Sequence, residues 1–246
     1  MTLSGRDFIR YSRHLLLADV GEDGQEKLLA SRVLIVGMGG LGCPVALYLA
    51  GAGVGRLVLC DPDQVELSNL QRQMLYRESD LGKLKAECAR EALLALNSGV
   101  DVRAWPQAVS EELWRDGGYD LVLDCTDSLP ARHWLNRQCR ELGTPLVSAA
   151  AIGWEGQFAC FDFRVRRSPC LACALPEDLP PPVETCANSG VIGPVLGTMG
   201  SMQAAAAIGA LLGRALDHGK MQRYDARSGA WLSLRIATRA GCEVCG

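Results

Sequence analysis

The sequence predicts an α/β fold in which a mainly parallel sheet has helices on both faces and is extended by antiparallel strands. Through the first 150 residues, short apolar runs rich in β-branched residues alternate with helical segments, which is typical of a buried parallel sheet. From about residue 156 apolar and polar residues alternate, which indicates antiparallel strands. We expect one domain over 1-246, made of a helical segment 1–30 and two halves, 31–150 and 151–246.

The composition limits the classes to which the chain can belong. Its 246 residues with 48% hydrophobic content are enough to bury a sizeable core, and a net charge of −3 gives no overall attraction to nucleic acid. No run of about 18 apolar residues is present to span a membrane. Met1 to Tyr11 carry charges where a secretory signal would be apolar. We therefore expect a cytoplasmic protein that binds neither membranes nor nucleic acid.

The N-terminal segment 1–30 has apolar residues among arginines, which predicts helix. Gly21 and Gly24 are expected to interrupt it, and a second short helix is expected from Gln25 to Leu29. This segment is not part of the minimal fold that the following elements predict. We expect it to pack on its own core or to reach a partner subunit.

The strongest signal is a strand, a glycine turn and a helix in direct succession. Val33 to Val36 form a buried strand, and an apolar helical segment begins at Pro44. Between them, Gly37 permits a tight turn, Gly39 lets a phosphate approach the backbone, and Gly42 lets the helix pack close to the strand. The helix N-terminus offers N–H groups to an anion. This pattern favours a Rossmann-like nucleotide site over a glycine-rich turn without a ligand.

The second strand, 56–60, ends at Asp61, about 20 residues beyond the glycine turn, where a carboxylate can bind ribose hydroxyls. A turn acid before Pro62 is the alternative explanation. Taken with the glycines, the position favours ribose binding.

The segment 63–73 is polar and irregular, which suits a site loop in which Asn69 and Arg72 face a phosphate chain. The helix expected at 82–96 carries Lys83 and Lys85 in its first turn, where the helix dipole disfavours cations. Lys85 therefore hints at an anion that it binds, although a solvated lysine is an equally good explanation from its position.

Strands expected at 100–104, 119–125 and 145–149 complete the parallel part. Asp127 follows the fourth strand, at the edge where ligand groups gather in open α/β sheets, and could hold Mg²⁺. An N-cap of the helix expected at 131–142 is an equally natural role for it.

Antiparallel strands are expected at 157–164, 221–224 and 231–236, and a helix of small residues at 194–212. The proline-rich loop 175–186 contains Cys186, a lone cysteine that could act as a nucleophile or sulfur acceptor.

Two C-x-x-C pairs predict a closed, structural zinc site. Each pair places two thiolates on one side of a turn, and two pairs complete a tetrahedral S₄ shell that suits Zn²⁺, with iron a poorer second. Unrelated redox pairs are the alternative. The predicted ligands are Cys170, Cys173, Cys242 and Cys245. Six further cysteines in apolar elements are expected in the core: Cys43, Cys60, Cys88, Cys125, Cys139 and Cys160.

Motifs spread over nearly the whole chain resemble those of the ThiF/MoeB adenylyltransferases, the bacterial relatives of ubiquitin-activating enzymes. The motifs are Arg10-Tyr-Ser-Arg13, Gly37-Met-Gly-Gly-Leu-Gly42, Ser68-Asn-Leu-Gln-Arg-Gln73, Asp124-Cys-Thr-Asp127 and the paired C-x-x-C turns. The opening segment, 6–17, looks more like the thiamin branch of the family than the molybdopterin branch.

The resemblance implies ATP-dependent adenylation of the C-terminal Gly-Gly carboxylate of a ubiquitin-like sulfur carrier, with release of pyrophosphate and then sulfur transfer. The expected catalytic residues are Arg13, Arg72, Lys85, Asp127 and Cys186. The expected nucleotide-binding residues are Gly37, Gly39, Gly40, Gly42, Asp61, Ser68, Asn69, Leu70, Gln71, Arg72, Lys85, Asp127 and Ser128. Within these sets, Asp127 would bind a catalytic Mg²⁺. Ser128 departs from the Asn that relatives often carry.

The resemblance also implies a homodimer in which Arg13 reaches the ATP of the neighbouring subunit, and a role for Cys186 in sulfur transfer. Because no rhodanese-like domain follows Gly246, sulfur is expected from another protein, such as a cysteine desulfurase. The alternatives are the same reaction on the molybdopterin-synthase small subunit, an NAD(P)-dependent oxidoreductase, and a non-catalytic scaffold. The cationic and acidic site residues suit a triphosphate better than the pyrophosphate of NAD(P), which argues against the oxidoreductase. Their presence also argues against a non-catalytic scaffold.

Overall fold

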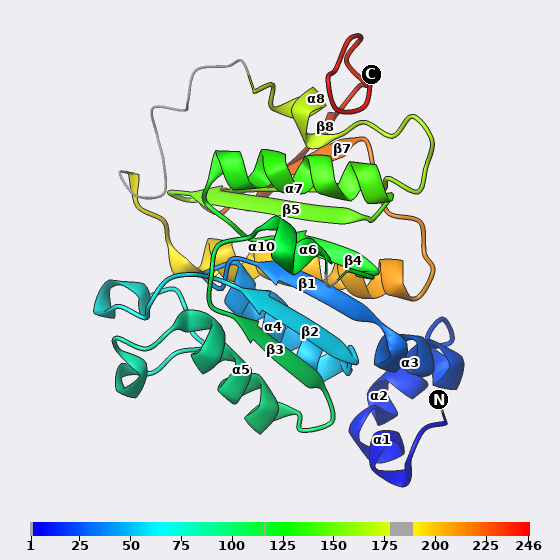
Figure 1. Cartoon of the computed structure of the whole chain (residues 1–246), viewed down its shortest axis with the longest axis vertical. Helices are drawn as coiled ribbons and strands as arrows, with labels where there is room; N and C mark the ends of the chain where they lie inside the picture. The colour runs from blue at the N-terminus through cyan, green and yellow to red at the C-terminus, as the bar shows by residue number, and fades with distance from the viewer. Residues whose placement is uncertain (1, 116, 178–188) are drawn as a thin grey trace.

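A computed structural model describes residues 2–115, 117–177 and 189–246 (Figure 1). Its centre is an eight-stranded sheet with the order β3-β2-β1-β4-β5-β6-β7-β8, which confirms the predicted fold class. The strands are β1 (Arg32–Val36), β2 (Arg56–Cys60), β3 (Asp101–Trp105), β4 (Leu121–Asp124), β5 (Leu146–Ile152), β6 (Glu155–Phe161), β7 (Lys220–Asp225) and β8 (Ala230–Arg235).

The first five strands are parallel, and the last three are antiparallel, as the change of pattern predicted. The chain runs from β1 outward through β2 to β3, then returns to the other side of β1 to form β4 and β5. The carboxyl end of β1 is therefore the point at which the strand order reverses, and open α/β sheets bind ligands at such points.

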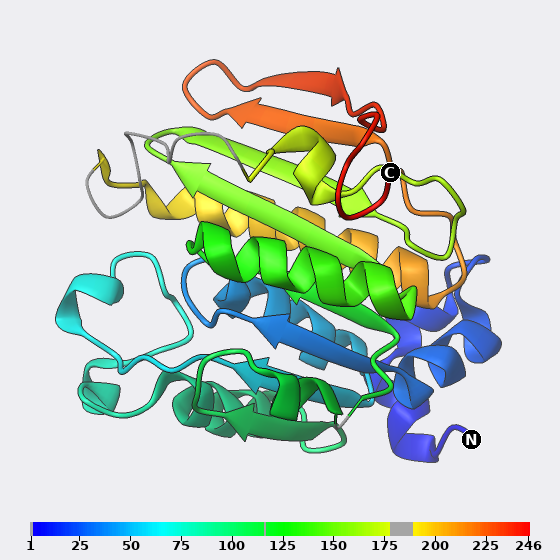
Figure 2. The same ribbon diagram turned by 45° about the horizontal axis from the view of Figure 1, so that its top comes forward.

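Helices cover both faces of the sheet (Figure 2). One face packs against α4 (Gly42–Ala52), α5 (Lys85–Leu96) and α10 (Gly193–Leu211), and the other against α6 (Glu111–Arg115), α7 (Leu129–Leu142) and α8 (Leu171–Ala174). Alternate residues of β1 point into the two cores: Val33 and Ile35 into the first, Leu34 and Val36 into the second. This explains why the strand is apolar without a break.

The N-terminal segment is helical, as predicted, with α1 (Gly5–Arg10), α2 (Ser12–Leu15) and α3 (Gly21–Ala30). The expected interruption at Gly24 is wrong, because Gly24 lies inside α3, which begins at Gly21. A Cβ atom on Gly24 would come within 2.9 Å of the Leu212 side chain. Glycine is used here for close packing against the end of α10, at a cost in helix propensity.

Short turns account for most other differences from prediction. The 3₁₀ turns η1 (Leu67–Asn69) and η2 (Glu78–Asp80) lie in the expected site loop and just before α5. The helices α6 and α8 were also not predicted, since one or two turns give too little periodicity to recognise. Among the described residues, no helix is both long and apolar enough to cross a membrane.

Candidate nucleotide site and cysteine cluster

The glycine turn after β1 is shaped by close backbone contacts. Gly37 has φ +93°, and a Cβ on it would come within 2.6 Å of the Cys125 carbonyl oxygen. A Cβ on Gly42 would lie 1.9 Å from the Gly37 carbonyl oxygen, so any side chain there would break the turn. Gly39 differs, because the nearest atom to an added Cβ is the Gln73 amide nitrogen at 3.7 Å. Gly37 and Gly42 therefore build the turn, while Gly39 leaves its backbone open to approach.

Asp61 joins the end of β2 to the glycine turn. Its carboxylate is buried and accepts hydrogen bonds from the backbone N–H groups of Met38, at 2.6 Å, and Asp63, at 2.8 Å. Burial raises the pKa of Asp61 and outweighs the two hydrogen bonds, which by themselves lower it. Each carboxylate oxygen has a further lone pair, so the residue can hold the turn and still accept a hydroxyl group. Ribose binding by Asp61 stays a prediction.

The segment Ser68 to Gln73 lies against the glycine turn. A Cβ on Gly40 would come within 3.4 Å of the Arg72 carbonyl oxygen and within 2.6 Å of the Leu196 side chain on α10. The Arg72 guanidinium donates to the Ser68 carbonyl oxygen at 2.9 Å, which folds its side chain back along the segment.

Asn69 is buried and holds the same segment in shape. Its side-chain oxygen accepts from the Glu66 N–H at 3.3 Å, and its amide nitrogen is 3.2 Å from the Ser68 hydroxyl. Leu70 is half-buried and Gln71 is exposed. The predicted site loop is therefore an ordered turn beside the glycines.

Lys85 is the first residue of α5 and is buried, so the alternative of a solvated lysine is wrong. Its ammonium nitrogen lies 2.9 Å from the Asp63 carboxylate, and its backbone N–H donates to the Asp63 carbonyl oxygen at 2.9 Å. Lys85 also lowers the pKa of the nearby Asp61. The cation is thus held at the inner wall of the site.

Asp127 lies on the loop that leaves β4, beside the glycine turn. The cap of α7 is Ser128, whose hydroxyl accepts the Ala131 N–H at 3.4 Å, so the alternative in which Asp127 caps the helix is wrong. Asp127 is exposed, and none of its side-chain atoms has a hydrogen-bond or ion-pair partner among the described residues. Its carboxylate is therefore available to a ligand, whereas the Ser128 hydroxyl already serves the helix.

A buried polar network behind this loop was not predicted. Asp124, the last residue of β4, is 0% exposed and accepts the Ser148 hydroxyl at 2.5 Å. Arg132 on α7 is also buried, with its Nε 3.7 Å from the Asp124 carboxylate. The Gln203 amide on α10 donates to the Asp124 carbonyl oxygen at 2.9 Å. An acid ending an apolar strand was a signal, but the sequence does not show what it contacts.

Arg13 lies away from the site residues of its own chain. Its neighbour Tyr11 accepts a hydrogen bond from Asn97, just beyond α5, at 3.0 Å, and Arg10 donates to the Leu96 carbonyl oxygen at 3.2 Å. These contacts place α2 at the C-terminal end of α5, while the glycine turn lies at the opposite ends of the strands (Figure 1). The last expected catalytic residue, Cys186, lies outside the described residues.

The four predicted metal ligands come together at the C-terminal end of the chain. All four sulfurs lie within 4.8 Å of one another, with distances of 3.7 Å for Cys170–Cys242 and 3.3 Å for Cys173–Cys245. A tetrahedral Zn²⁺ with Zn–S bonds of about 2.3 Å separates sulfurs by about 3.8 Å, so the cluster fits this ion. The C-terminal turn is thereby brought against α8, as Figure 2 shows.

The surroundings of the cluster raise the pKa of one of its thiols and lower the pKa of another. Burial raises the pKa of Cys170 to about 11, although the nearby Asn136 amide favours the thiolate. At Cys242 burial also raises the pKa, but hydrogen bonds, foremost from the Val244 N–H, outweigh it and lower the pKa to about 7. Asn136 is buried in α7 and accepts the Leu171 N–H at 2.9 Å, which fixes the turn that carries Cys170. The six expected core cysteines are all buried.

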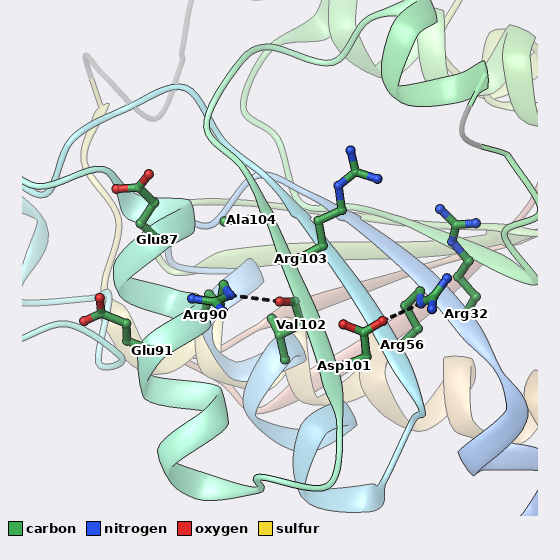
Figure 3. Close-up of a pocket in the computed structure, with 9 residues that line it drawn as sticks. All are labelled: Arg32, Arg56, Glu87, Arg90, Glu91, Asp101, Val102, Arg103 and Ala104. Atoms are coloured by element: carbon green, nitrogen blue, oxygen red, sulfur yellow. Dashed lines mark hydrogen bonds and ion pairs between the residues drawn. The ribbon is translucent and has the colours of Figure 1, made fainter.

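A groove of about 650 Å³ lies elsewhere in the molecule (Figure 3). It lies around the first residues of β1, β2 and β3, at the end of the strands opposite the glycine turn. Two of its arginines have partners within the groove: Arg56 lies 2.6 Å from Asp101, and Arg90 donates to the Val102 carbonyl oxygen at 3.1 Å. The Arg90 contact covers part of the open edge of β3, which protects the sheet.

Comparisons with known proteins identify a family model, curated relatives and solved structures that the chain matches. The model of the ThiF family matches residues 11–244. The chain is 44% identical over 246 residues to a protein of Escherichia coli (strain K12) named sulfur carrier protein ThiS adenylyltransferase, covering 99% of this chain and 97% of that protein. It is 45% identical over 251 residues to adenylyltransferase and sulfurtransferase MOCS3 of Mus musculus, covering 99% of this chain but 54% of the relative. The crystal structure of E. coli MccB with ATP is similar, with a TM-score of 0.81 and 26% identity over 96% of this chain and 73% of that chain.

Proposed function

The chain belongs to the ThiF family, and on this basis we propose that it adenylates the C-terminal Gly-Gly carboxylate of a ubiquitin-like sulfur carrier of the ThiS type, at the expense of ATP. The observation that carries the proposal is the convergence of the glycine turn with Asp61, Arg72, Lys85 and Asp127 at the carboxyl ends of β1, β2 and β4. The near full-length likeness to a ThiS adenylyltransferase supports the choice of carrier.

The proposed reaction needs positioning and charge rather than a general base. A carboxylate oxygen of the carrier attacks the α-phosphorus, a new P–O bond forms, and the bond to the β-phosphate bridge breaks with its electron pair leaving on pyrophosphate. The nucleophile is already ionised, so no proton has to move. Lys85 and Arg72 offset the repulsion between the two anions and the charge that develops on the leaving group.

Asp127 is the proposed ligand of Mg²⁺, because its carboxylate is exposed and Ser128 takes the capping role. Carboxylate oxygens are the ligands that Mg²⁺ prefers, and the bound ion would offset negative charge on the phosphates. Gly39 and the backbone of the turn would face the phosphates, and Asp61 the ribose.

A homodimer would add a further cation, Arg13 of the second copy, to the site. The helix α2, which contains Arg13, lies at the ends of the strands opposite the glycine turn, which is consistent with a role at the site of a second copy. After adenylation, a sulfur nucleophile from a donor such as a cysteine desulfurase would displace AMP from the carrier. Cys186 is the residue proposed to take part in that transfer.

The cluster of four cysteines at the C-terminal end of the chain is proposed to hold a structural zinc ion, since all four ligand positions come from the protein. One sheet that runs from residue 32 to residue 235 supports a single adenylation domain. Free cysteines throughout the described residues favour a reducing compartment, which supports a cytoplasmic location.

The test is ATP–pyrophosphate exchange by the purified protein, with thiamin-type and molybdopterin-type carriers supplied separately. We expect exchange that depends on the thiamin-type carrier and is lost in Asp127→Ala. Exchange only with the molybdopterin-type carrier would assign the chain to the other branch of the family. The chain spans about half the length of the MOCS3 relative, so that relative does not decide between the carriers. Exchange with neither carrier would contradict the proposal.

A further inference from the structure

The loop that carries Asp127 is held from behind by a buried ion pair. Asp124 and Arg132 are 0% and 6% exposed, and the Arg132 Nε lies 3.7 Å from the Asp124 carboxylate. The pair bridges the last residue of β4 and the first turn of α7. Asp127 lies on the chain between them.

Both members of the pair bind Thr126, the residue before Asp127. The Asp124 carboxylate accepts the Thr126 N–H at 3.1 Å and the Thr126 hydroxyl at 2.9 Å. The Arg132 guanidinium donates to the Thr126 carbonyl oxygen and, at 2.7 Å, to the Ala149 carbonyl oxygen on β5. Three hydrogen-bonding groups of Thr126 are therefore fixed by one charge pair.

The residue after Asp127 is fixed as well. The Ser128 hydroxyl accepts the Ala131 N–H in the first turn of α7, and the Ser128 carbonyl oxygen lies 3.4 Å from the Thr126 hydroxyl. The residues on both sides of Asp127 thus have defined partners, while Asp127 itself is exposed.

Stability alone is a weak reason to keep such a pair. Removing two charges from water costs several kcal/mol per ion, and well-packed apolar residues often stabilise a fold as well or better. What the pair adds is a directional set of hydrogen bonds to one loop, and apolar residues cannot provide that.

We propose that Arg132 is a positioning residue, which acts through Thr126 to hold the Asp127 carboxylate where a divalent cation bound to the triphosphate meets it. The proposal rests on the proposed function, in which Asp127 is the Mg²⁺ ligand. It predicts that Arg132 and Asp127 contribute to the same step and that their effects do not add.

The experiment is a double-mutant cycle with Arg132→Gln, Asp127→Ala and the double variant. Calorimetry measures the affinity for a non-hydrolysable ATP analogue, once with Mg²⁺ and once with EDTA. We expect Arg132→Gln to lose about tenfold in affinity with Mg²⁺ and less than about twofold with EDTA. In the Asp127→Ala background, Arg132→Gln should have no further effect. Arg140→Gln, on the same helix but away from the loop, is the charge-matched control and should bind as the wild type does.

Two results would overturn the proposal: equal losses with Mg²⁺ and EDTA, or full additivity in the double variant. If Arg132→Gln does not fold, as judged by circular dichroism, Arg132→Lys takes its place, because lysine keeps the charge but cannot reach both carbonyl oxygens. Wild-type affinity for the Mg²⁺ complex in Arg132→Lys would also contradict the proposal. Since the binding readout needs no carrier, failure of the exchange assay would be recognised separately as failure of the proposed function.

Discussion

The Lys85 ammonium lies 2.9 Å from the Asp63 carboxylate, in a pair whose lysine side chain is 8% exposed and whose aspartate side chain is 65% exposed. The lysine ammonium is thus held inside the protein, while the aspartate carboxylate with which it pairs faces solvent. Under the proposed function, a phosphate of ATP would take the place of Asp63 as the partner of the lysine. The pair keeps a buried cation neutralised when no nucleotide is bound.

This arrangement separates the roles of the two residues. Lys85→Ala should lower carrier-dependent ATP–pyrophosphate exchange by about a hundredfold or more, because a charge that stabilises the transition state is lost. Asp63→Asn should change the exchange rate by less than about threefold, since an exposed partner contributes little. Equal losses in the two variants would mean that the ion pair itself is the functional unit.

Two glycines of the turn give a matched pair of variants. Gly42→Ala places a Cβ 1.9 Å from the Gly37 carbonyl oxygen and should lower the free energy of unfolding by about 3 kcal/mol or more. Gly39→Ala meets no close atom and should change it by less than about 1 kcal/mol. Gly39→Ala should nevertheless weaken ATP binding by about tenfold, because the methyl group stands where the phosphate approaches. Urea denaturation and calorimetry measure the two effects, and normal ATP binding by Gly39→Ala would remove Gly39 from the site.

The proposed role of Arg13 at a second subunit is tested by complementation. Arg13→Ala and Asp127→Ala should each be nearly inactive in pyrophosphate exchange. An equal mixture, unfolded and refolded together, should recover about a quarter of wild-type activity, because half of the dimers are mixed and each mixed dimer has one intact site. No recovery, with mixed dimers detected by differently tagged chains, would show that Arg13 does not act on the partner.

Removal of the metal should loosen the C-terminal part of the chain. Cys245→Ser, or a strong chelator, should release the bound ion and lower the melting temperature, because the energy of binding at a closed thiolate site contributes to folding. Cys88→Ser changes a buried cysteine outside the cluster and should keep the full metal content. Metal content by mass spectrometry decides the matter, and an unchanged content in Cys245→Ser would contradict a four-cysteine site.

The stability of the protein should depend on His133 at mildly acidic pH. Burial lowers the pKa of His133, aided by Arg137 and opposed by Glu177, whose carboxylate lies 3.5 Å from its Nδ1. Below its unfolded pKa of about 6.5, the unfolded chain binds a proton that the native chain does not bind. Stability should therefore fall as the pH drops below about 6.5, by up to about 1.4 kcal/mol per pH unit, and this part of the loss should vanish in His133→Phe. Urea denaturation between pH 5.5 and 8 measures the stability of both proteins. If the stability of wild type and His133→Phe changed with pH by the same amount, the role of His133 would be refuted.

The strands and the long helices were predictable because their signals are local. Val33 to Val36 and the glycines after them define a strand and a turn within ten residues, and the structure places both as predicted. The C-x-x-C spacing likewise led directly to four sulfurs that meet.

What sequence reasoning missed depends on contacts between distant residues. Gly24 looked like a helix breaker because its packing partner, Leu212, is far along the chain. Asp127 and Ser128 are adjacent and both are good N-caps, so only the geometry of α7 assigns the cap to Ser128. The Lys85–Asp63 pair required the loop between these residues to fold back on itself.

The helix α7 serves two places in the molecule from one face. Arg132 holds the loop beyond β4, and Asn136, four residues later, holds the turn of Cys170. One residue inserted or deleted between them would rotate one side chain by about 100° relative to the other, so the two contacts could not both survive. The spacing of Arg132 and Asn136 along α7 is therefore a structural requirement that does not depend on which residues occupy the positions between them.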